Sequence, residues 1–427
     1  MKAREYQERL STEAADVLKS KKIVYLAFEV RTGKTLTSLL TAEKSGSKNV
    51  LFLTKKKAIT SIQWDYDNYD NGFNFKITIV NDESIHLINS SFDLIIHDEH
   101  HRFGAYPKPS GRTKEFKKRF GDLPMIFLSG TPTPESYSQW FHQFWISNYS
   151  PFKHYINFYK WANEYVNVKT KYLGYAQVKD YSDADNKKIK SVIRHYILTF
   201  TQKEAGFTTD VNENVLEVEM LPITKIIIEK LKSDLVVKNK EGKTILGDTA
   251  VKLMQKIHQL SSGTIKFEDG TSKVVDYSKA EYIKESFKDY KIGIFYKFKE
   301  EYNALKEILK EKLTDNLDDF NTSNKWIALQ IVSGREGISL KEADYLVYYN
   351  IDFSAVSYWQ SRDRLTTMER KNNQVFYVFG KGGIELKIYQ SVLNKRDYTS
   401  SLFKKDYGIT NTDKNKKEAT SRRLYRY

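Results

Sequence analysis

The sequence predicts an α/β protein with two parallel-sheet domains in tandem, joined by a partly helical connector. Short apolar runs alternate with segments of helical spacing in the first half of the chain, and the same alternation returns after about residue 276. The length of 427 residues matches two or three domains at roughly 150 residues each. Hydrophobic residues make up 40% and aromatic residues 14% of the chain, which excludes wholesale disorder.

The expected elements of the first domain begin with a helix over residues 6–19, because Leu10, Ala14 and Leu18 recur on one side. The run Ile23–Phe28 follows as a strand, and residues 36–42 follow as a helix. Further apolar runs, each followed by a loop, predict strands over residues 49–53, 76–80, 94–97 and 125–128. Buried strands that alternate with helices indicate a parallel sheet covered on both faces. Ligands of such sheets bind at the carboxyl ends of the strands, so we expect the chemistry in those loops.

The second domain is expected from about residue 276, with strands over residues 292–295, 326–332, 345–349 and 375–379 and a helix over 300–312. Helical patterns over residues 225–236 and 249–260 predict a helical insertion before it. We therefore expect a first domain with a helical extension over residues 1–215, a connector over 216–275 and a second domain over 276–427. Residues 403–427 hold eight Lys or Arg against three Asp or Glu, which predicts a basic tail.

Composition narrows the class of function. The chain has no cysteine, which excludes disulfides, thiolate metal sites and cysteine nucleophiles and fits a reducing cytoplasm. Its longest apolar runs fall far short of the roughly 18 residues that span a bilayer, and its polar first residues do not fit a signal peptide, so we expect no membrane partner. Lys and Arg number 69 against 54 Asp and Glu, a net charge of +15, which favours a polyanionic partner.

The segment Gly33-Lys34-Thr35 follows the first strand and opens a helix, which is the context of a phosphate-binding loop. Backbone N–H groups at a helix N-terminus bind phosphate oxygens. Lys34 would reach the β- and γ-phosphates, and the Thr35 hydroxyl would hold Mg²⁺, so ATP and Mg²⁺ are the expected cofactors. The full pattern requires a glycine five residues before Gly33, where Phe28 stands, so this segment alone is a weak signal.

The segment Asp98-Glu99-His100-His101 follows the strand over residues 94–97. Asp98 would hold Mg²⁺ and Glu99 would polarise the attacking water. Taken alone, the segment could also be an exposed acidic turn or a His/Asp metal cluster, and the phosphate loop favours the ATPase interpretation.

The segment Ser129-Gly130-Thr131 follows the next strand. Its small hydroxyl residues could link the nucleotide site to another surface. The alternative is an ordinary turn.

In this order the motifs resemble those of the superfamily-2 helicases and translocases. Motif I matches residues 29–35, motif II residues 98–101 and motif III residues 129–131, and Arg4 and Gln7 stand where these proteins place an adenine-reading glutamine. The second half resembles the Swi/Snf-like branch, because the spacing from Gly337 to Gln360 and Arg364 looks like motifs V and VI in register. The compact size looks like the short versions that bacteriophages encode.

The resemblance implies two RecA-like motor domains in tandem, with ATP between them and DNA across both. The implied catalytic residues are Lys34, Asp98, Glu99, Gln360 and Arg364, with Arg364 as the arginine finger. The resemblance also implies residues that contact ATP, residues that hold Mg²⁺ and residues that couple the site to the nucleic acid. The ATP contacts are Arg4, Gln7, Arg31, Thr32, Gly33, Lys34, Thr35, Gly337 and Arg370. The Mg²⁺ ligands are Thr35 and Asp98. The coupling residues are His100, His101, Ser129 and Thr131.

Three positions depart from the family pattern. Arg31 replaces a glycine that is usual in motif I, and it could contact DNA or the second domain. Thr367 stands where a second motif VI arginine is expected, and Arg362 or Arg370 could take that role. His100-His101 replaces the commoner Ala-His or Gly-His ending of motif II. Lys34, Asp98, Glu99 and Arg364 are retained, so we expect an active ATPase.

Two basic segments are the expected nucleic-acid contacts. Residues 55–57 are three lysines that follow the strand over 49–53, at the position where motif Ia of the family contacts the nucleic-acid backbone. The alternative interpretation of these lysines is a solvated start of a helix. Residues 108–119 hold six basic residues and one acidic residue and could grip a duplex or a junction, with a soluble loop as the alternative. The expected contacts are Lys55, Lys56, Lys57, Lys108, Arg112, Lys114, Lys117 and Lys118.

Together these features predict an ATP-dependent DNA helicase or translocase, acting on duplex, branched or single-stranded DNA in replication, recombination or repair. We expect a monomer in the cytoplasm of a bacterium or a phage-infected host, with replication or recombination proteins as possible partners. Three alternatives stay open. They are an RNA helicase or RNA-remodelling ATPase, a nucleic-acid-binding scaffold inactivated by Arg31 and Thr367, and the motor subunit of a restriction complex.

Overall fold

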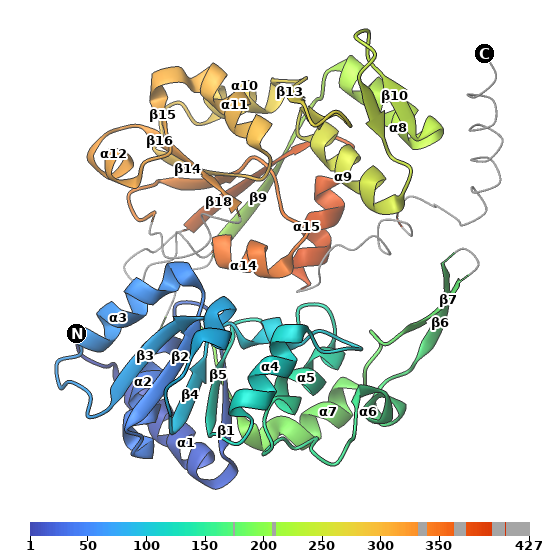
Figure 1. Cartoon of the computed structure of the whole chain (residues 1–427). Coiled ribbons are helices and arrows are strands. Elements are labelled where there is room, and N and C mark those ends of the chain that lie inside the picture. Colours follow the sequence, from blue (N-terminus) through green and yellow to red (C-terminus); the bar gives the residue numbers. More distant parts are fainter. Residues whose placement is uncertain (174–175, 207–210, 332–339, 363–372, 395–405, 407–427) are drawn as a thin grey trace. The chain divides into compact units, whose positions relative to one another are not determined.

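The computed structural model describes residues 1–173, 176–206, 211–331, 340–362, 373–394 and 406. The chain divides into two compact units, residues 1–208 and 209–427, and each is described by itself (Figure 1). Among the residues described, no helix combines the length and the apolar character needed to cross a membrane.

The first unit is built on a six-stranded sheet in the order β3-β2-β4-β5-β1-β8. Every neighbouring pair runs parallel. The strands are β1 Ile23–Phe28, β2 Asn49–Thr54, β3 Lys76–Asn81, β4 Leu94–His97, β5 Met125–Leu128 and β8 Ile197–Phe200. The five strands expected in this region are all present. The edge strand β8 was not predicted.

Successive residues of the central strands enter two different cores. In β1, Tyr25 packs into one hydrophobic cluster and Val24 and Leu26 into the other. Both faces of the strand are therefore buried, which explains why β1 is continuously apolar rather than alternating. Each buried side chain of this size contributes about 1.5–3 kcal/mol through removal of apolar surface from water.

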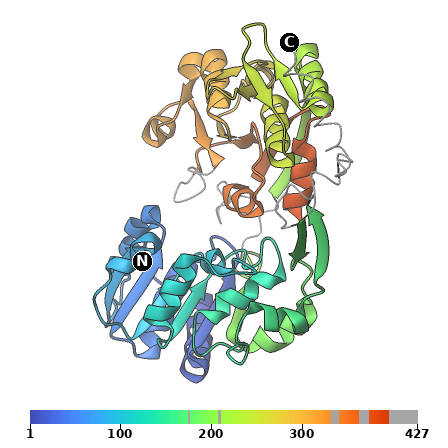
Figure 2. The ribbon, with the colours of Figure 1, turned by 45° about the vertical axis from the view of Figure 1, so that its right-hand side comes forward.

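Helices cover both faces of this sheet (Figure 2). Apolar residues of α1, α2 and α3 pack on one face, and those of α4, α5, α6 and α7 on the other. Side-chain caps start several of these helices, as where Ser110 accepts from the backbone N–H of Thr113 at the start of α4. Their bounds are α1 Glu5–Lys21, α2 Lys34–Ser45, α3 Ile59–Asp67, α4 Gly111–Phe120, α5 Trp140–Trp145, α6 Phe158–Tyr165 and α7 Asn186–Ile193. An antiparallel ribbon, β6 Lys169–Leu173 and β7 Ala176–Asp180, projects beyond α6 and α7.

The second unit repeats the design with a six-stranded parallel sheet in the order β15-β16-β14-β17-β18-β9. The strands are β9 Val211–Val218, β14 Ile292–Tyr296, β15 Leu313–Thr314, β16 Trp326–Gln330, β17 Tyr345–Tyr348 and β18 Asn373–Gly380. Its helices are α8 Pro222–Asp234, α9 Ala250–Ser261, α10 Ser278–Ser286, α11 Lys299–Leu309, α12 Leu317–Thr322, α14 Ala355–Arg362 and α15 Glu385–Leu393. Two small hairpins complete it, β10 Val236–Lys238 with β11 Thr244–Leu246, and β12 Thr264–Lys266 with β13 Ser272–Val274.

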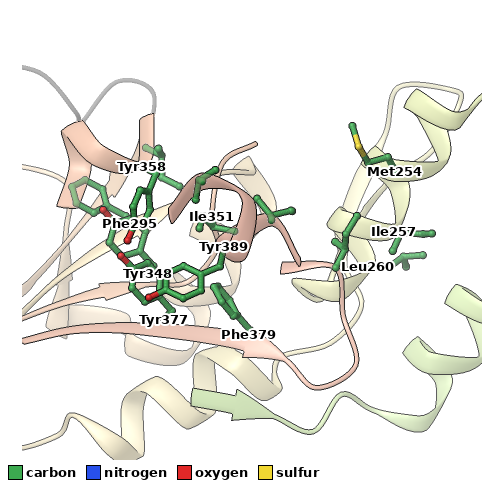
Figure 3. Packing of buried hydrophobic residues seen from close by; sticks show 14 of the residues in the cluster. Met254, Ile257, Leu260, Phe295, Tyr348, Ile351, Tyr358, Tyr377, Phe379 and Tyr389 are labelled. Atoms are coloured by element: carbon green, nitrogen blue, oxygen red, sulfur yellow. The ribbon is translucent and has the colours of Figure 1, made fainter. Parts of the chain in front are cut away.

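The segment expected as a connector, residues 216–275, lies within the second unit. Leu231 of α8 and Ile257 of α9 belong to the same hydrophobic cluster as Phe295 of β14 and Tyr348 of β17. Figure 3 shows Ile257, Phe295 and Tyr348 of this cluster. The strand β9, which the expected first domain partly included, pairs with β18 over eight residues at the edge of the second sheet. The second unit thus contains an edge strand and two helices that lie, in sequence, ahead of residue 276.

Candidate functional site

Gln7, near the start of the chain, contacts the loop between β1 and α2. The Gln7 side chain donates from Nε2 to the carbonyl oxygen of Gly33 at 3.2 Å, and its Oε1 accepts from the backbone N–H of Arg4 at 2.9 Å. Gly33 has a φ of 77°, and a Cβ at this position would lie 2.1 Å from Gln7 Nε2. Glycine is favoured here, because a side chain would be strained by this left-handed conformation and would displace the Gln7 amide.

Lys34 is the first residue of α2, and its ammonium points back into the loop. Nζ donates to the carbonyl oxygens of Phe28 and Glu29, at 3.0 Å each. A Cβ on Gly130 would lie 3.6 Å from the same Nζ, so the lysine also borders the loop after β5. An ammonium bonded to carbonyl oxygens at a helix N-terminus stands where phosphate oxygens could replace them as acceptors.

The acidic pair lies at the carboxyl end of β4, the second neighbour of β1 in the sheet. Asp98 accepts from the Thr54 hydroxyl at 3.0 Å and from the backbone N–H of Glu99 at 2.9 Å. Burial and then the charge of Glu99 raise the pKa of Asp98 to about 6, while Thr54 and Lys34 oppose this rise. A buried carboxylate with this electrostatic cost is stabilised by a bound cation.

The donor set fits Mg²⁺ held together with a nucleotide. Asp98 and Thr35 supply a carboxylate and a hydroxyl oxygen, which are the hard ligands that Mg²⁺ prefers. Within the described part of the chain, no group of three or more His, Asp or Glu side chains could hold a metal ion. Where Mg²⁺ binds together with a nucleotide, the protein supplies one or two oxygen ligands, and water and phosphate oxygens complete the coordination shell.

The acidic pair is connected to the loop after β5 through His101. Its Nδ1 lies 3.0 Å from Ser129 Oγ and 3.3 Å from Glu99 Oε2. Ser129 Oγ in turn accepts from the backbone N–H of Thr131 at 3.2 Å. Glu99, His101, Ser129 and Thr131 therefore form one connected group that spans two strand ends.

His100 is not part of this group, although it was predicted beside His101 as a coupling residue. Its ring is fully buried and stacks on Phe127, with centroids 3.7 Å apart. Its two nitrogens face His97 Nδ1 at 2.7 Å and the carbonyl oxygen of Gln143 at 2.8 Å. Burial lowers the pKa of His100 well below its usual value, so it packs as a neutral side chain under the site.

Two further residues shape the loop: Gln202, which was not predicted, and Thr32, which was predicted as an ATP contact. Gln202 follows β8, and its backbone N–H donates to Glu29 Oε2 at 2.8 Å while its Nε2 donates to the carbonyl oxygen of Val30 at 3.0 Å. Inside the loop, the Thr32 hydroxyl donates to the carbonyl oxygen of Glu29 at 2.7 Å. Because Gln202 is distant in sequence and follows an unpredicted strand, no local pattern marked it.

The predicted site residues of the second unit are described only in part. Gln360 lies in α14, but its side chain is outside what the structure describes. Gly337, Arg364 and Arg370 all lie outside the described residues.

The predicted nucleic-acid contacts fall into two groups. Lys56, Lys108, Lys114 and Lys118 are exposed, and Lys55 is half-buried in the turn after β2. By contrast, Lys117 donates to the carbonyl oxygen of Trp145 at 2.5 Å and lies 4.3 Å from the centroid of its ring, and Arg112 lies 3.8 Å from Glu83. The side chain of Lys57 is outside the described part. Lys117 is thus committed to packing, whereas the exposed lysines are accessible to phosphate.

Comparisons with known proteins define the class of fold. No family model matches the chain, and no curated protein does. The helicase domain of Hef from Pyrococcus furiosus is similar with a TM-score of 0.50 at 16% identity, over 91% of this chain and 98% of that one. The SWI2/SNF2 ATPase core of Sulfolobus solfataricus, solved in complex with dsDNA, is similar with a TM-score of 0.42 at 16% identity, over 96% and 95%.

The protein has two six-stranded parallel sheets in tandem, a fold that it shares with the Hef helicase domain. This confirms the predicted fold class of two RecA-like domains. At this identity the likeness shows the fold, and the resemblance to phage-encoded proteins stays a prediction.

Proposed function

We propose that this protein is a nucleic-acid-dependent ATPase that moves on DNA as a helicase or translocase. The observation that carries the proposal is the meeting of Lys34, Asp98, Glu99 and Ser129 at the carboxyl edge of one parallel sheet. Fold alone does not imply an activity, so the argument rests on this group of side chains.

Each residue has a role that follows from its position. The N-terminus of α2 would bind phosphate oxygens through backbone N–H groups, and Lys34 would exchange its carbonyl contacts for the β- and γ-phosphates. Bound Mg²⁺ would neutralise charge on the phosphates, held by Thr35 and Asp98. Glu99 would orient the attacking water, and its contact with His101 links that carboxylate to Ser129 and Thr131.

The remaining predicted roles belong to the same proposal. Gln7 would select the adenine, and Gln360 and Arg364 would complete the site from the second unit, with Arg364 stabilising charge on the transferring phosphoryl group. Gly337 and Arg370 stay proposed ATP contacts. DNA is the proposed track because of the net charge of +15 and the exposed lysines after β2 and in and before α4. A role in replication, recombination or repair, a monomeric state and a cytoplasmic location are proposed with it.

The decisive experiment measures ATP turnover with duplex DNA, single-stranded DNA and RNA, each at two salt concentrations. We expect stimulation by DNA that weakens at high salt, because phosphate contacts release counterions. Lys34→Ala and Glu99→Gln should abolish turnover. Lys44→Ala is the matched control, since Lys44 lies at the other end of α2 and contacts Glu8 and Ser11 instead.

Two results would contradict the proposal. Stimulation by RNA alone would indicate an RNA-dependent enzyme. Undetectable turnover in the unmodified protein with every nucleic acid would indicate a binding scaffold without ATPase activity.

A further inference from the structure

The helix α14 is held to the second sheet by two tyrosine hydroxyls. Tyr348, from β17, donates to Ser361 Oγ at 2.5 Å, and Tyr358, within the helix, donates to Glu213 Oε1 at 2.6 Å. This helix carries Gln360, and Arg364, which lies outside the described residues, stands four positions after Gln360 in the sequence. The residues that hold α14 in place therefore help to set the position of Gln360, which is proposed to act on ATP.

Glu213 is the meeting point of three tyrosines. Besides Tyr358, its carboxylate accepts from Tyr389 of α15 at 2.5 Å and from Tyr377 of β18 at 3.4 Å. All three rings are buried, and Tyr377 lies 4.7 Å from Tyr389 and 4.7 Å from Tyr348 between centroids (Figure 3). Hydroxyl bonds to a carboxylate are stronger than neutral ones, and a buried tyrosine ring leaves little freedom to its hydroxyl.

The position of Glu213 in the fold gives this cluster its importance. Glu213 is the third residue of β9, which is the first strand of the second unit and pairs with β18 through all eight of its residues. One carboxylate thus joins the strand at which the chain enters the second unit to the helix that carries Gln360. Tyr389 shares that carboxylate but lies on α15, which holds none of the predicted ATP residues.

We propose that Glu213 and Tyr358 are positioning residues for ATP turnover, which hold α14 in the orientation that hydrolysis requires. This inference rests on the proposed ATPase function. Because the phosphate loop and the acidic pair belong to the first unit, loss of this anchor should lower kcat and leave the KM for ATP nearly unchanged.

The test compares Tyr358→Phe with Tyr389→Phe in the full-length protein. Each variant removes one hydroxyl from the same carboxylate and keeps the ring, so both should lower Tm by a similar amount. We expect Tyr358→Phe to lower DNA-stimulated kcat about tenfold, which corresponds to 1.4 kcal/mol in the activation barrier. The KM for ATP should stay within about twofold, and Tyr389→Phe should keep kcat near that of the unmodified protein.

Glu213→Gln provides a second variant, because the amide keeps an acceptor oxygen but loses the charge. It should give a loss of kcat smaller than that of Tyr358→Phe, and Glu213→Ala a larger one. Equal kcat values in Tyr358→Phe and Tyr389→Phe would overturn the inference while leaving the ATPase proposal intact. Absence of turnover in the unmodified protein would instead overturn the proposed function itself.

Discussion

Arg31 and Glu99 both adopt left-handed backbone conformations, with φ of 60° and 49°. This conformation costs a non-glycine residue on the order of 1 kcal/mol, and it persists where the surrounding structure determines the backbone. Arg31 stands where the superfamily-2 helicases, whose motifs this sequence resembles, have glycine, and the loop keeps the conformation that glycine would favour. Arginine at this position therefore adds a side chain, while the backbone of the loop keeps a conformation that glycine would also adopt.

Arg364 is the residue for which the sequence makes the sharpest functional prediction. Arg364→Ala should leave ATP binding largely intact and lower turnover by about three orders of magnitude, since a missing arginine finger leaves transition-state charge uncompensated. Binding is measured by nucleotide titration and turnover by phosphate release. Unchanged turnover would transfer the role to Arg362 or Arg370, and turnover of Arg362→Ala and Arg370→Ala would show which of the two carries it.

Among the secondary-structure elements, the strands that are buried on both faces could be predicted from the sequence. Leu94–His97 and Met125–Leu128 have the expected bounds because every residue in them is buried, so their apolar runs are unbroken. The edge strand β9 has the sequence VNENVLEV, and only its last residue, Val218, is buried, whereas the others are half-buried or exposed. Its Asn and Glu residues give no continuous apolar run, and it was missed for that reason.

The same limit holds within the candidate site. Lys34, Asp98 and Glu99 follow predicted strands directly, so their motifs and their location could be predicted together. Thr54 and Gln202 contact the site only because β2 and β8 lie beside the strands that carry it, and a contact between distant segments leaves no local pattern in the sequence.

The helix α4 carries two kinds of lysine, one that packs against the rest of the unit and two that are exposed and could bind phosphate. Lys114→Gln combined with Lys118→Gln should weaken DNA binding and reduce the slope of log Kd against log salt by about 2, because two exposed charges on one face are removed. Lys117→Gln should leave that slope unchanged and lower the free energy of unfolding by about 1 kcal/mol, since it loses its bond to the Trp145 carbonyl.

Binding titrations at three or more salt concentrations and thermal denaturation measure the two effects. The reverse pattern, with Lys117→Gln changing the salt slope and the double variant only the stability, would contradict this assignment. Burial lowers the pKa of Lys117, which agrees with a role in packing.

At the scale of the whole molecule, acid should destabilise the first unit through its buried histidines. His142 is 2% exposed, its Nδ1 lies 2.6 Å from the carbonyl oxygen of Ala105, and burial lowers its pKa from 6.5 to about 4. The unfolded chain therefore binds a proton between pH 6.5 and 4 that the folded chain does not. The stability that neutral His142 supports is fully present above pH 6.5 and is lost as the pH falls through that window.

His142→Gln removes this titration and keeps a side-chain N–H donor. Between pH 7.5 and pH 5, the unmodified protein should lose on the order of 2 kcal/mol more unfolding free energy than the variant. Urea denaturation at the two pH values measures the difference. His100 titrates in both proteins and cancels, so equal losses would show that His142 is protonated in the folded state as readily as in the unfolded one.

The chain passes from β8, an edge strand of the first sheet, to β9, an edge strand of the second, through residues 201–210. The proposed movement along DNA would place tension on this link between the two sheets. Tension that enters β9 along its own axis loads the hydrogen bonds of an eight-residue parallel ladder in shear, so they must yield together rather than open one after another. The pairing of β9 with β18 thus makes the start of the second unit resistant to a force that pulls on the chain ahead of it.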